Sequence, residues 1–286
     1  MNEKQFPSLE KYSLLVHIAF HFVRDRIQYL TQVLNATYQY PFRHIEIVID
    51  TNTDELDLAS LPKASEHITI RLEIHREMDH PFLLTWQHRP QMLAQLDQHD
   101  YFMYIEDDIV VSSNGIKRWH EDSIDLYFQG YIRGFIRTEI TRDGTRVSTD
   151  QYRKTRLKNI RSINGKPYYL PQNPYQGFWI YSKEQMGDFI NSSCWKDGNC
   201  DWSIRERASA GMTWITPAPR KNNSNSHGFV IPLNNQLKLD ENVLVDHAPN
   251  NYALDEDSKF GVIPVKHLTQ LNYFDQLRYR LRRNFS

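Results

Sequence analysis

The alternation of short apolar runs with helical segments in the first part of the chain most strongly limits its fold. Apolar or β-branched runs predict strands at residues 14–20, 44–49, 68–74 and 101–105. Amphipathic stretches predict helices at residues 24–36 and 82–96, and Pro90 should kink or split the second one. Strands that alternate with helices form mainly parallel sheets. We therefore expect an α/β protein with one Rossmann-like domain, in which helices flank a mainly parallel central sheet.

The second part of the chain predicts a less regular mixture of elements. Helices are expected at residues 114–129, 183–190 and 201–210, the last with Asp201 as its N-cap, and strands at residues 132–140 and 178–181. A polar, basic segment predicts a hairpin or loops at residues 141–166, and a Pro/Asn/Ser-rich segment predicts a loop at residues 216–228. We expect a single domain over residues 1–286. Its parts would be a nucleotide-binding half (about 1–112), an acceptor-binding half (113–265) and a C-terminal helix (266–286).

The composition fits a globular domain and gives no reason to expect nucleic acid as a partner. The chain is 40% hydrophobic, which supplies a sizeable core, and its formal net charge is −1. Cys194 and Cys200 cannot build a CxxC zinc pattern or a disulfide framework. The first residues have no apolar signal segment, and no apolar run is long enough to span a membrane. We therefore expect a cytoplasmic protein.

Three consecutive carboxylates, Glu106, Asp107 and Asp108, follow the fourth expected strand directly. Neighbouring buried carboxylates repel one another, and a hard divalent cation would offset that repulsion. Mg²⁺ and Mn²⁺ prefer oxygen ligands and often complete their shell with substrate phosphates. Because ligands collect beyond the carboxyl ends of parallel strands, this position favours a Mn²⁺ or Mg²⁺ site over a plain acidic turn.

Polar residues also end the second expected strand, where Asp50 and Asn52 stand. Such a strand end is a place to contact the base and ribose of a nucleotide. A local Asx-turn explains the same residues equally well. Arg24, at the start of the first expected helix, could reach a nucleotide, but a surface ion pair is the favoured interpretation.

The acidic triplet resembles the D-x-D-type motif of GT-A fold glycosyltransferases, in the E-D-D form that is typical of the N-acetylglucosaminyltransferase I family. The resemblance implies that Asp108 contacts the metal and that Glu106 lies near the nucleotide ribose and metal-bound waters. Asp107 belongs to the same motif and is assigned to the donor site. The resemblance also implies a single GT-A-like domain.

Three later segments resemble the same family. Gly177-Phe178-Trp179-Ile180-Tyr181-Ser182-Lys183 is similar to its glycine-aromatic strand on the acceptor side. Cys200-Asp201-Trp202-Ser203-Ile204-Arg205 resembles its D-D-W-x-x-R segment, which implies that Asp201 is the catalytic base, although Cys200 replaces an aspartate. Pro219-Arg220-Lys221 and Ser224-Asn225-Ser226-His227-Gly228 resemble its basic loop that ends in S-H-G and closes over the donor. This comparison assigns Arg220, Lys221, Ser226 and His227 to donor binding.

The chemistry of an inverting sugar transfer requires similar groups. A carboxylate must accept the proton of the acceptor hydroxyl, and Asp201 or, one turn further along, Glu206 could do so. Positive charge must stabilise the departing diphosphate, and a cation with Arg220 and Lys221 would supply it. A lid that excludes water protects the donor from hydrolysis, which suits the loop at residues 216–228.

Weaker patterns indicate further candidates for the metal site and the acceptor site. His247 follows an expected strand and is a candidate metal ligand, in competition with His227 and with a plain hydrogen-bonded role. Tyr175 and Trp179 could stack on an acceptor sugar, although a packed core explains Trp179 nearly as well. The group His75, Glu77, Asp79 and His80 lacks a fixed ligand spacing and is interpreted as surface.

The C-terminal tail has apolar residues at near-helical spacing together with four arginines: Leu271, Phe274, Leu277, Leu281, Arg278, Arg280, Arg282 and Arg283. A basic amphipathic helix can lie on the inner face of an anionic membrane, which would suit a lipid-linked acceptor. Packing on the domain with a solvated basic edge is the simpler expectation.

The favoured function is a metal-dependent, inverting glycosyltransferase that moves a sugar, most simply from a UDP-sugar, to a glycan, glycolipid or other hydroxyl acceptor. Two rivals remain. Carboxylates at strand ends also build Mg²⁺-dependent phosphoesterases. A non-catalytic carbohydrate- or nucleotide-binding protein on the same fold is the other, and the substitution at Cys200 leaves it open.

Overall fold

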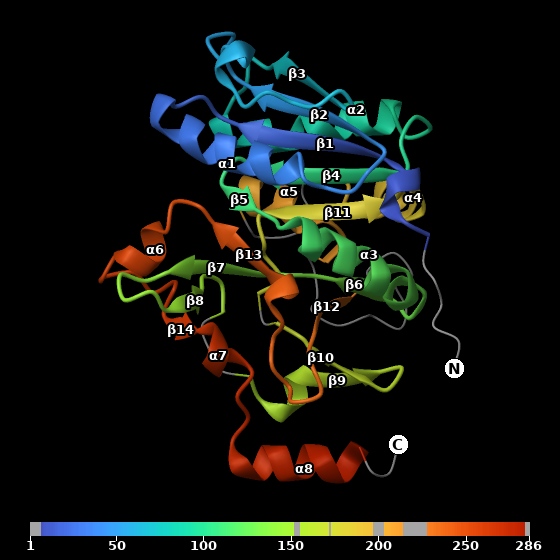
Figure 1. The fold of residues 1–286 in the computed structure, drawn as a ribbon, viewed down its shortest axis with the longest axis vertical. Coiled ribbons are helices and arrows are strands. Elements are labelled where there is room, and N and C mark those ends of the chain that lie inside the picture. The colour runs from blue at the N-terminus through green and yellow to red at the C-terminus, as the bar shows by residue number, and fades with distance from the viewer. Residues whose placement is uncertain (1–6, 152–154, 172, 197–202, 214–227, 284–286) are drawn as a thin grey trace.

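The computed structural model describes residues 7–151, 155–171, 173–196, 203–213 and 228–283. Its architecture is mixed α/β, with sheets of parallel and antiparallel strands flanked by helices (Figure 1). This confirms the expected α/β class. Within the described residues, no helix is long and apolar enough to cross a membrane.

The first sheet has the strand order β11-β4-β1-β2-β3. Its members are β1 (Ser13–Phe20), β2 (His44–Thr51), β3 (Ile68–Ile74), β4 (Tyr101–Glu106) and β11 (Phe178–Ser182). The first four strands are parallel, as predicted, whereas β11 runs antiparallel to β4. All eight residues of β1 and all six of β4 are buried, which explains why these strands are almost continuously apolar in the sequence.

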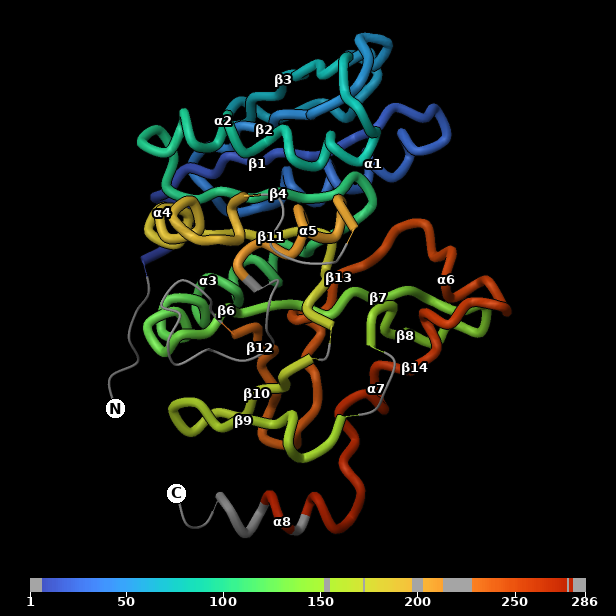
Figure 2. Tube along the Cα trace, turned by 180° about the vertical axis from the view of Figure 1, so that it is seen from behind, coloured from blue at the N-terminus to red at the C-terminus, as the bar shows by residue number. Residues whose placement is uncertain are grey.

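Helices cover both faces of this sheet (Figures 1 and 2). On one face, Leu14, Val16 and Ile18 of β1 share a core with residues of α1 (Ile27–Thr37) and α3 (Ser113–Phe128). On the other face, Leu15 and Ala19 share a core with α2 (His88–Ala94), α4 (Lys183–Asn191) and α5 (Ile204–Ala210). The alternation of side chains along β1 therefore separates two cores.

Two smaller sheets occupy the rest of the molecule. The order β14-β8-β7-β13-β5 joins β5 (Ile109–Val110), β7 (Ile136–Ile140), β8 (Arg146–Ser148), β13 (Leu244–His247) and β14 (Ile263–Pro264). The order β6-β12-β10-β9 joins β6 (Tyr131–Arg133), β9 (Ile160–Ile163), β10 (Lys166–Tyr169) and β12 (Gly228–Pro232). Only Asp107 and Asp108 lie between β4 of the first sheet and β5 of the second.

The remaining elements are short, apart from the C-terminal helix. They are α6 (Asn251–Leu254), α7 (Val265–Leu268) and α8 (Tyr273–Arg283). Turns of 3-10 helix cover Leu9–Lys11, Arg24–Arg26, Leu58–Ser60, Pro81–Trp86, Leu157–Asn159, Gly211–Thr213 and Glu241–Val243.

Several expected boundaries are wrong for local reasons. The strand expected at residues 132–140 is split into β6 and β7, because the Cα of Gly134 lies against the ring of Phe229; a Cβ at Gly134 would come within 1.8 Å of that ring. The split expected at Pro90 is confirmed: a 3-10 helix ends at Trp86 and α2 begins at His88, with Pro90 in its first turn, where its missing N–H is not needed. Helix α5 has Ser203 at its N-cap position, so the expected start at Asp201 is wrong.

The hairpin expected within residues 141–166 is confirmed in part. Strand β8 pairs antiparallel with β7, and β9 pairs antiparallel with β10. The second pair turns at Asn164 and Gly165, which both have positive φ angles. Two successive residues of this kind build the tight turn that matches the twist of a hairpin.

His88 should make the stability of the fold depend on pH. It is completely buried and stacks on Tyr104 with ring centroids 4.4 Å apart, and burial holds its pKa well below the usual value. The unfolded chain gains a proton on this residue below about pH 6.5, whereas the folded protein does not. The free energy of unfolding should therefore fall as the pH drops below about 6.5. Urea unfolding at several pH values between 8 and 5 measures this change. The free energy of unfolding should depend less on pH in His88→Phe than in the parent, and an equal dependence in both proteins would exclude a contribution from His88.

Candidate functional site

The acidic triplet lies at the point where the order of the first sheet reverses. From β1 the chain proceeds to β2 on one side, whereas β4 lies on the other side of β1. In open parallel sheets, ligands bind beyond the carboxyl ends of the strands at such a switch point. Glu106 ends β4 beside Ala19 of β1, so Asp107 and Asp108 extend into this position.

Arg26 forms ion pairs with two of the three acids. Its Nε and one terminal nitrogen donate to the two oxygens of Asp107, at 2.8 and 2.6 Å. The same terminal nitrogen donates to Asp108 Oδ2 at 2.8 Å. The sequence directed attention to Arg24 in the same turn, and nothing in the local pattern distinguishes the two arginines. The functional candidate is therefore Arg26.

Burial and the neighbouring charges shift the pKa values of the three carboxyl groups. Burial, together with the Asp108 and Glu106 carboxylates, raises the pKa of Asp107 to about 7, although Arg26 opposes that shift. Burial also raises the pKa of Glu106. For Asp108, burial is outweighed by the contacts with His247 and Arg26, and its pKa lies below the usual value. Asp108 is therefore the member that most strongly keeps its negative charge.

Glu106 is enclosed by hydroxyl groups rather than open to a ligand. The Tyr175 hydroxyl donates to its carboxylate, with oxygens 2.7 and 2.9 Å away, and the Ser209 hydroxyl donates to the same group. Arg205 is the nearby positive charge, and Glu106 raises the pKa of that guanidinium above its usual value. Both Ser209 and Arg205 belong to α5. Glu106 therefore connects the end of β4 to α5.

His247 faces Asp108 from the second sheet. Its Nε2 lies 3.5 Å from Asp108 Oδ2, and its Nδ1 shares a hydrogen bond with Glu139. Glu139 is held in turn by the backbone N–H of Ala253 at 2.5 Å. A carboxylate that holds one ring nitrogen orients the other nitrogen toward a ligand, as it does for metal-bound histidines. The prediction for His247 is thus compatible with the structure, and Glu139 is a partner that the sequence did not reveal.

Gly177 lets the backbone approach this corner closely. Its φ angle is +76°, and a Cβ at this position would lie 2.6 Å from Ile109 Cγ1. Its carbonyl accepts the backbone N–H of Glu106 at 3.0 Å. The segment that begins at Gly177 therefore packs directly on the triplet, for which a glycine is the suitable residue.

The carboxylate of Asp50 and the side-chain oxygen of Asn52 are engaged by neighbouring groups of the protein. The two Asp50 oxygens lie 2.8 Å from His17 Nδ1 and 2.9 Å from His75 Nε2, and Asp50 is only 1% exposed. The Asn52 side chain accepts the backbone N–H of Phe22 at 2.8 Å. Both residues thus hold neighbouring strand ends together, and the expected nucleotide contact and Asx-turn are both corrected. His75, interpreted as surface, is part of this buried group.

The two aromatic candidates for acceptor stacking are buried. Tyr175 lies beneath the Arg137 guanidinium, 4.7 Å from its ring centroid, with its hydroxyl on Glu106. Trp179 stacks on Tyr181 with centroids 4.9 Å apart, and its indole N–H donates to the carbonyl of Ala208. Neither ring offers a free face to a sugar, so both acceptor assignments are corrected.

Glu206 is the described candidate for the base. It lies on α5 three residues before Ser209, and therefore on the same side of the helix as the residue that contacts Glu106. Its Oε1 is 3.3 Å from Arg205, and its Oε2 is buried without a hydrogen-bond partner among the described residues. The other candidates of the base segment and the basic loop lie outside the described residues: Asp201, Arg220, Lys221, Ser226 and His227.

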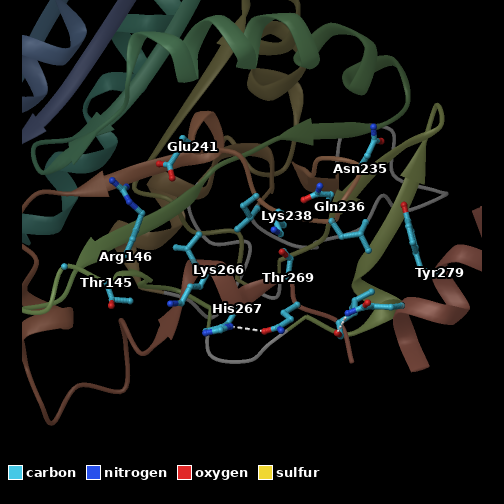
Figure 3. Close-up of a pocket in the computed structure, with 17 residues that line it drawn as sticks. Thr145, Arg146, Asn235, Gln236, Lys238, Glu241, Lys266, His267, Thr269 and Tyr279 are labelled. Atoms are coloured by element: carbon cyan, nitrogen blue, oxygen red, sulfur yellow. Dashed lines mark hydrogen bonds between the residues drawn. The ribbon is translucent and has the colours of Figure 1, made fainter. Parts of the chain in front are cut away.

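A cavity of about 940 Å³ lies elsewhere, between β8, the segment 235–241, α7 and α8 (Figure 3). Arg146 lines it and pairs with Asp246 at 2.5 Å. Asp246 precedes His247 in β13, and successive side chains of a strand point to opposite faces. The cavity is therefore separated from Asp108 by the second sheet, and we do not assign it to the triplet.

Comparison with known proteins assigns no family to this chain. The chain matches no protein-family model and no curated protein.

Proposed function

We propose that this chain is a metal-dependent, inverting glycosyltransferase with a GT-A-like domain, and that its donor is a nucleotide-sugar such as a UDP-sugar. The observation that carries the proposal is the pairing of Asp108 with His247 at the switch point of a parallel sheet. Mn²⁺ or Mg²⁺ and a glycan or lipid-linked acceptor complete the proposed reaction.

The residues at this corner fit a divalent cation. Asp108 Oδ1 is buried and has no hydrogen-bond partner among the described residues, so a ligand position is free. A carboxylate with an imidazole suits Mn²⁺ better than Mg²⁺, which prefers oxygen alone. The described residues contain no group of three or more potential metal-binding side chains, so the donor phosphates would complete the shell. When bound, the cation would stabilise negative charge on the departing diphosphate.

The protein side chains would perform the remaining steps. Arg26 lies beside the same acids and donates to Asp107. Its guanidinium would also bind the diphosphate of the donor. The acceptor hydroxyl attacks the anomeric carbon while the bond to the diphosphate breaks, and its proton passes to a carboxylate of the base segment, Asp201 or Glu206. The hydrogen bond of Ser209 with Glu106 brings α5, which follows that segment, to the triplet, and this supports the assignment.

A transfer assay with two base variants tests this function. With a panel of UDP-sugars, Mn²⁺ and hydroxyl acceptors, Asp201→Asn or Glu206→Gln should abolish transfer while UDP binding is retained. Glu184→Gln, an exposed carboxylate change on α4, is the control and should retain transfer. Full transfer by both base variants would contradict the assignment. Release of free sugar without transfer to any acceptor would instead support hydrolysis.

One observation favours the non-catalytic alternative. Arg26 already neutralises Asp107 and contacts Asp108, so the triplet is satisfied in part without a cation. A protein that only binds a nucleotide or sugar would then need no metal. Equal donor affinity with Mn²⁺ and with EDTA, together with no turnover, would support this alternative.

A further inference from the structure

Helix α8 exposes two adjacent aromatic side chains at the end of the molecule farthest from the first sheet (Figure 1). Tyr273 is 74% exposed and Phe274 is 73% exposed. A folded chain seldom leaves two neighbouring rings in water without a use for them. They form an apolar patch that is separate from the candidate functional site.

The side of α8 that faces the protein carries Gln276 and Tyr279 rather than Phe274. Gln276 and Tyr279 of α8 line the 940 Å³ cavity, opposite Lys266 and Thr269 (Figure 3). At about 3.6 residues per turn, Phe274 lies almost diametrically opposite the side that carries these two residues. A helix that packs on its own domain normally buries its large apolar side chains, whereas α8 leaves Tyr273 and Phe274 exposed.

The sequence adds two leucines at helical positions that share the side of Phe274, and the segment as a whole is basic. Leu277 and Leu281 stand three and seven residues after Phe274, at positions on the same side of the helix. The segment Tyr273–Arg283 contains four arginines and one aspartate, a formal charge of +3, whereas the whole chain carries −1. Arg278, five residues after Tyr273, is exposed. At about 3.6 residues per turn, the exposed Arg278 lies on the same side of the helix as Phe274, so a cationic group stands beside the apolar patch.

We propose that α8 docks on a membrane surface that contains anionic lipids. The aromatic stripe would enter the headgroup boundary, and the arginines beside it would contact lipid phosphates. A second copy of the chain is a poorer occupant, because a symmetric pairing would bring two helices of charge +3 together. The proposal does not depend on the glycosyltransferase function.

Vesicle flotation of the full chain tests the docking. Vesicles of phosphatidylcholine with phosphatidylglycerol should bind the parent protein, and pure phosphatidylcholine vesicles should bind it far less. The double variant Tyr273→Ser, Phe274→Ser should bind the anionic vesicles at least about tenfold more weakly. Phe128→Ser is the matched control, because Phe128 is 69% exposed on α3, and it should bind like the parent.

Further measurements test the roles of charge and of self-association. Arg278→Glu should weaken binding to anionic vesicles, and added salt should do the same. Light scattering should give the same mass for the parent and the double variant. No binding by the parent, equal binding to both vesicle types, or equal loss in Phe128→Ser would overturn the proposal. A parent dimer that the double variant converts to a monomer, with no vesicle binding, would assign the stripe to a second copy. No donor, metal or turnover is required, so failure here leaves the proposed function untouched.

Discussion

Asp108→Ala should weaken the Mn²⁺-dependent binding of UDP by at least about tenfold, which corresponds to about 1.4 kcal/mol. The substitution removes the carboxylate with the unoccupied Oδ1 and leaves His247 as the only described side chain proposed to bind the metal. Calorimetric titration of UDP with Mn²⁺, repeated with EDTA, measures the effect. The parent should lose affinity in EDTA, whereas the variant should bind weakly in both conditions.

Asp246→Ala provides the matched control for this experiment. This variant also replaces an aspartate with alanine, at the residue next to His247. The carboxylate of Asp246, however, pairs with Arg146 on the other face of the second sheet. Its UDP affinity should equal that of the parent, with Mn²⁺ and with EDTA. Equal affinity in Asp108→Ala and the parent would remove the metal assignment, provided that both proteins melt at similar temperatures.

Asp150→Ala should lower the free energy of unfolding by about 3–5 kcal/mol, because it leaves the Arg137 guanidinium buried without its counter-charge. Two nitrogens of Arg137 donate to the two Asp150 oxygens, each at 2.9 Å, and both side chains are less than 10% exposed. Urea unfolding at neutral pH measures the loss. Because Arg137 also lies over the ring of Tyr175, which binds Glu106, the variant should lose UDP affinity as well.

An exposed ion pair provides the comparison for Asp150. Arg142 and Glu256 are 3.4 Å apart, with side chains 74% and 87% exposed, so solvent already screens their charges. Glu256→Ala should leave the unfolding curve unchanged within measurement error. If Asp150→Ala and Glu256→Ala have the same effect, the buried pair does not stabilise the fold as argued.

Local patterns in the sequence were sufficient for much of the first sheet. The prediction for β3 is confirmed at both ends, and those for β1, β2 and β4 are confirmed within one or two residues. β1 and β4 are buried along their whole length, so their apolar runs are almost unbroken and easily recognised. The position of the acidic triplet at the end of β4 follows from the same signal.

The contacts of the candidate site required the structure, because they join residues that are distant along the chain. Glu139 and Asp108 meet at His247, which is supplied by another strand of the second sheet. A sequence pattern also gives the type of a side chain without its direction. Tyr175 was therefore predicted to lie open to an acceptor, whereas packing turns its ring under Arg137 and its hydroxyl onto Glu106.

The two-residue connection between β4 and β5 has a mechanical consequence. Asp107 and Asp108 are both a candidate ligand-binding segment and the direct connection between the two sheets. The carbonyl of Asp108 is tied to the backbone N–H of Ala248, just past β13, at 2.9 Å. A molecule held by these acids would therefore be attached to both sheets at once, at the point where the chain passes from one to the other.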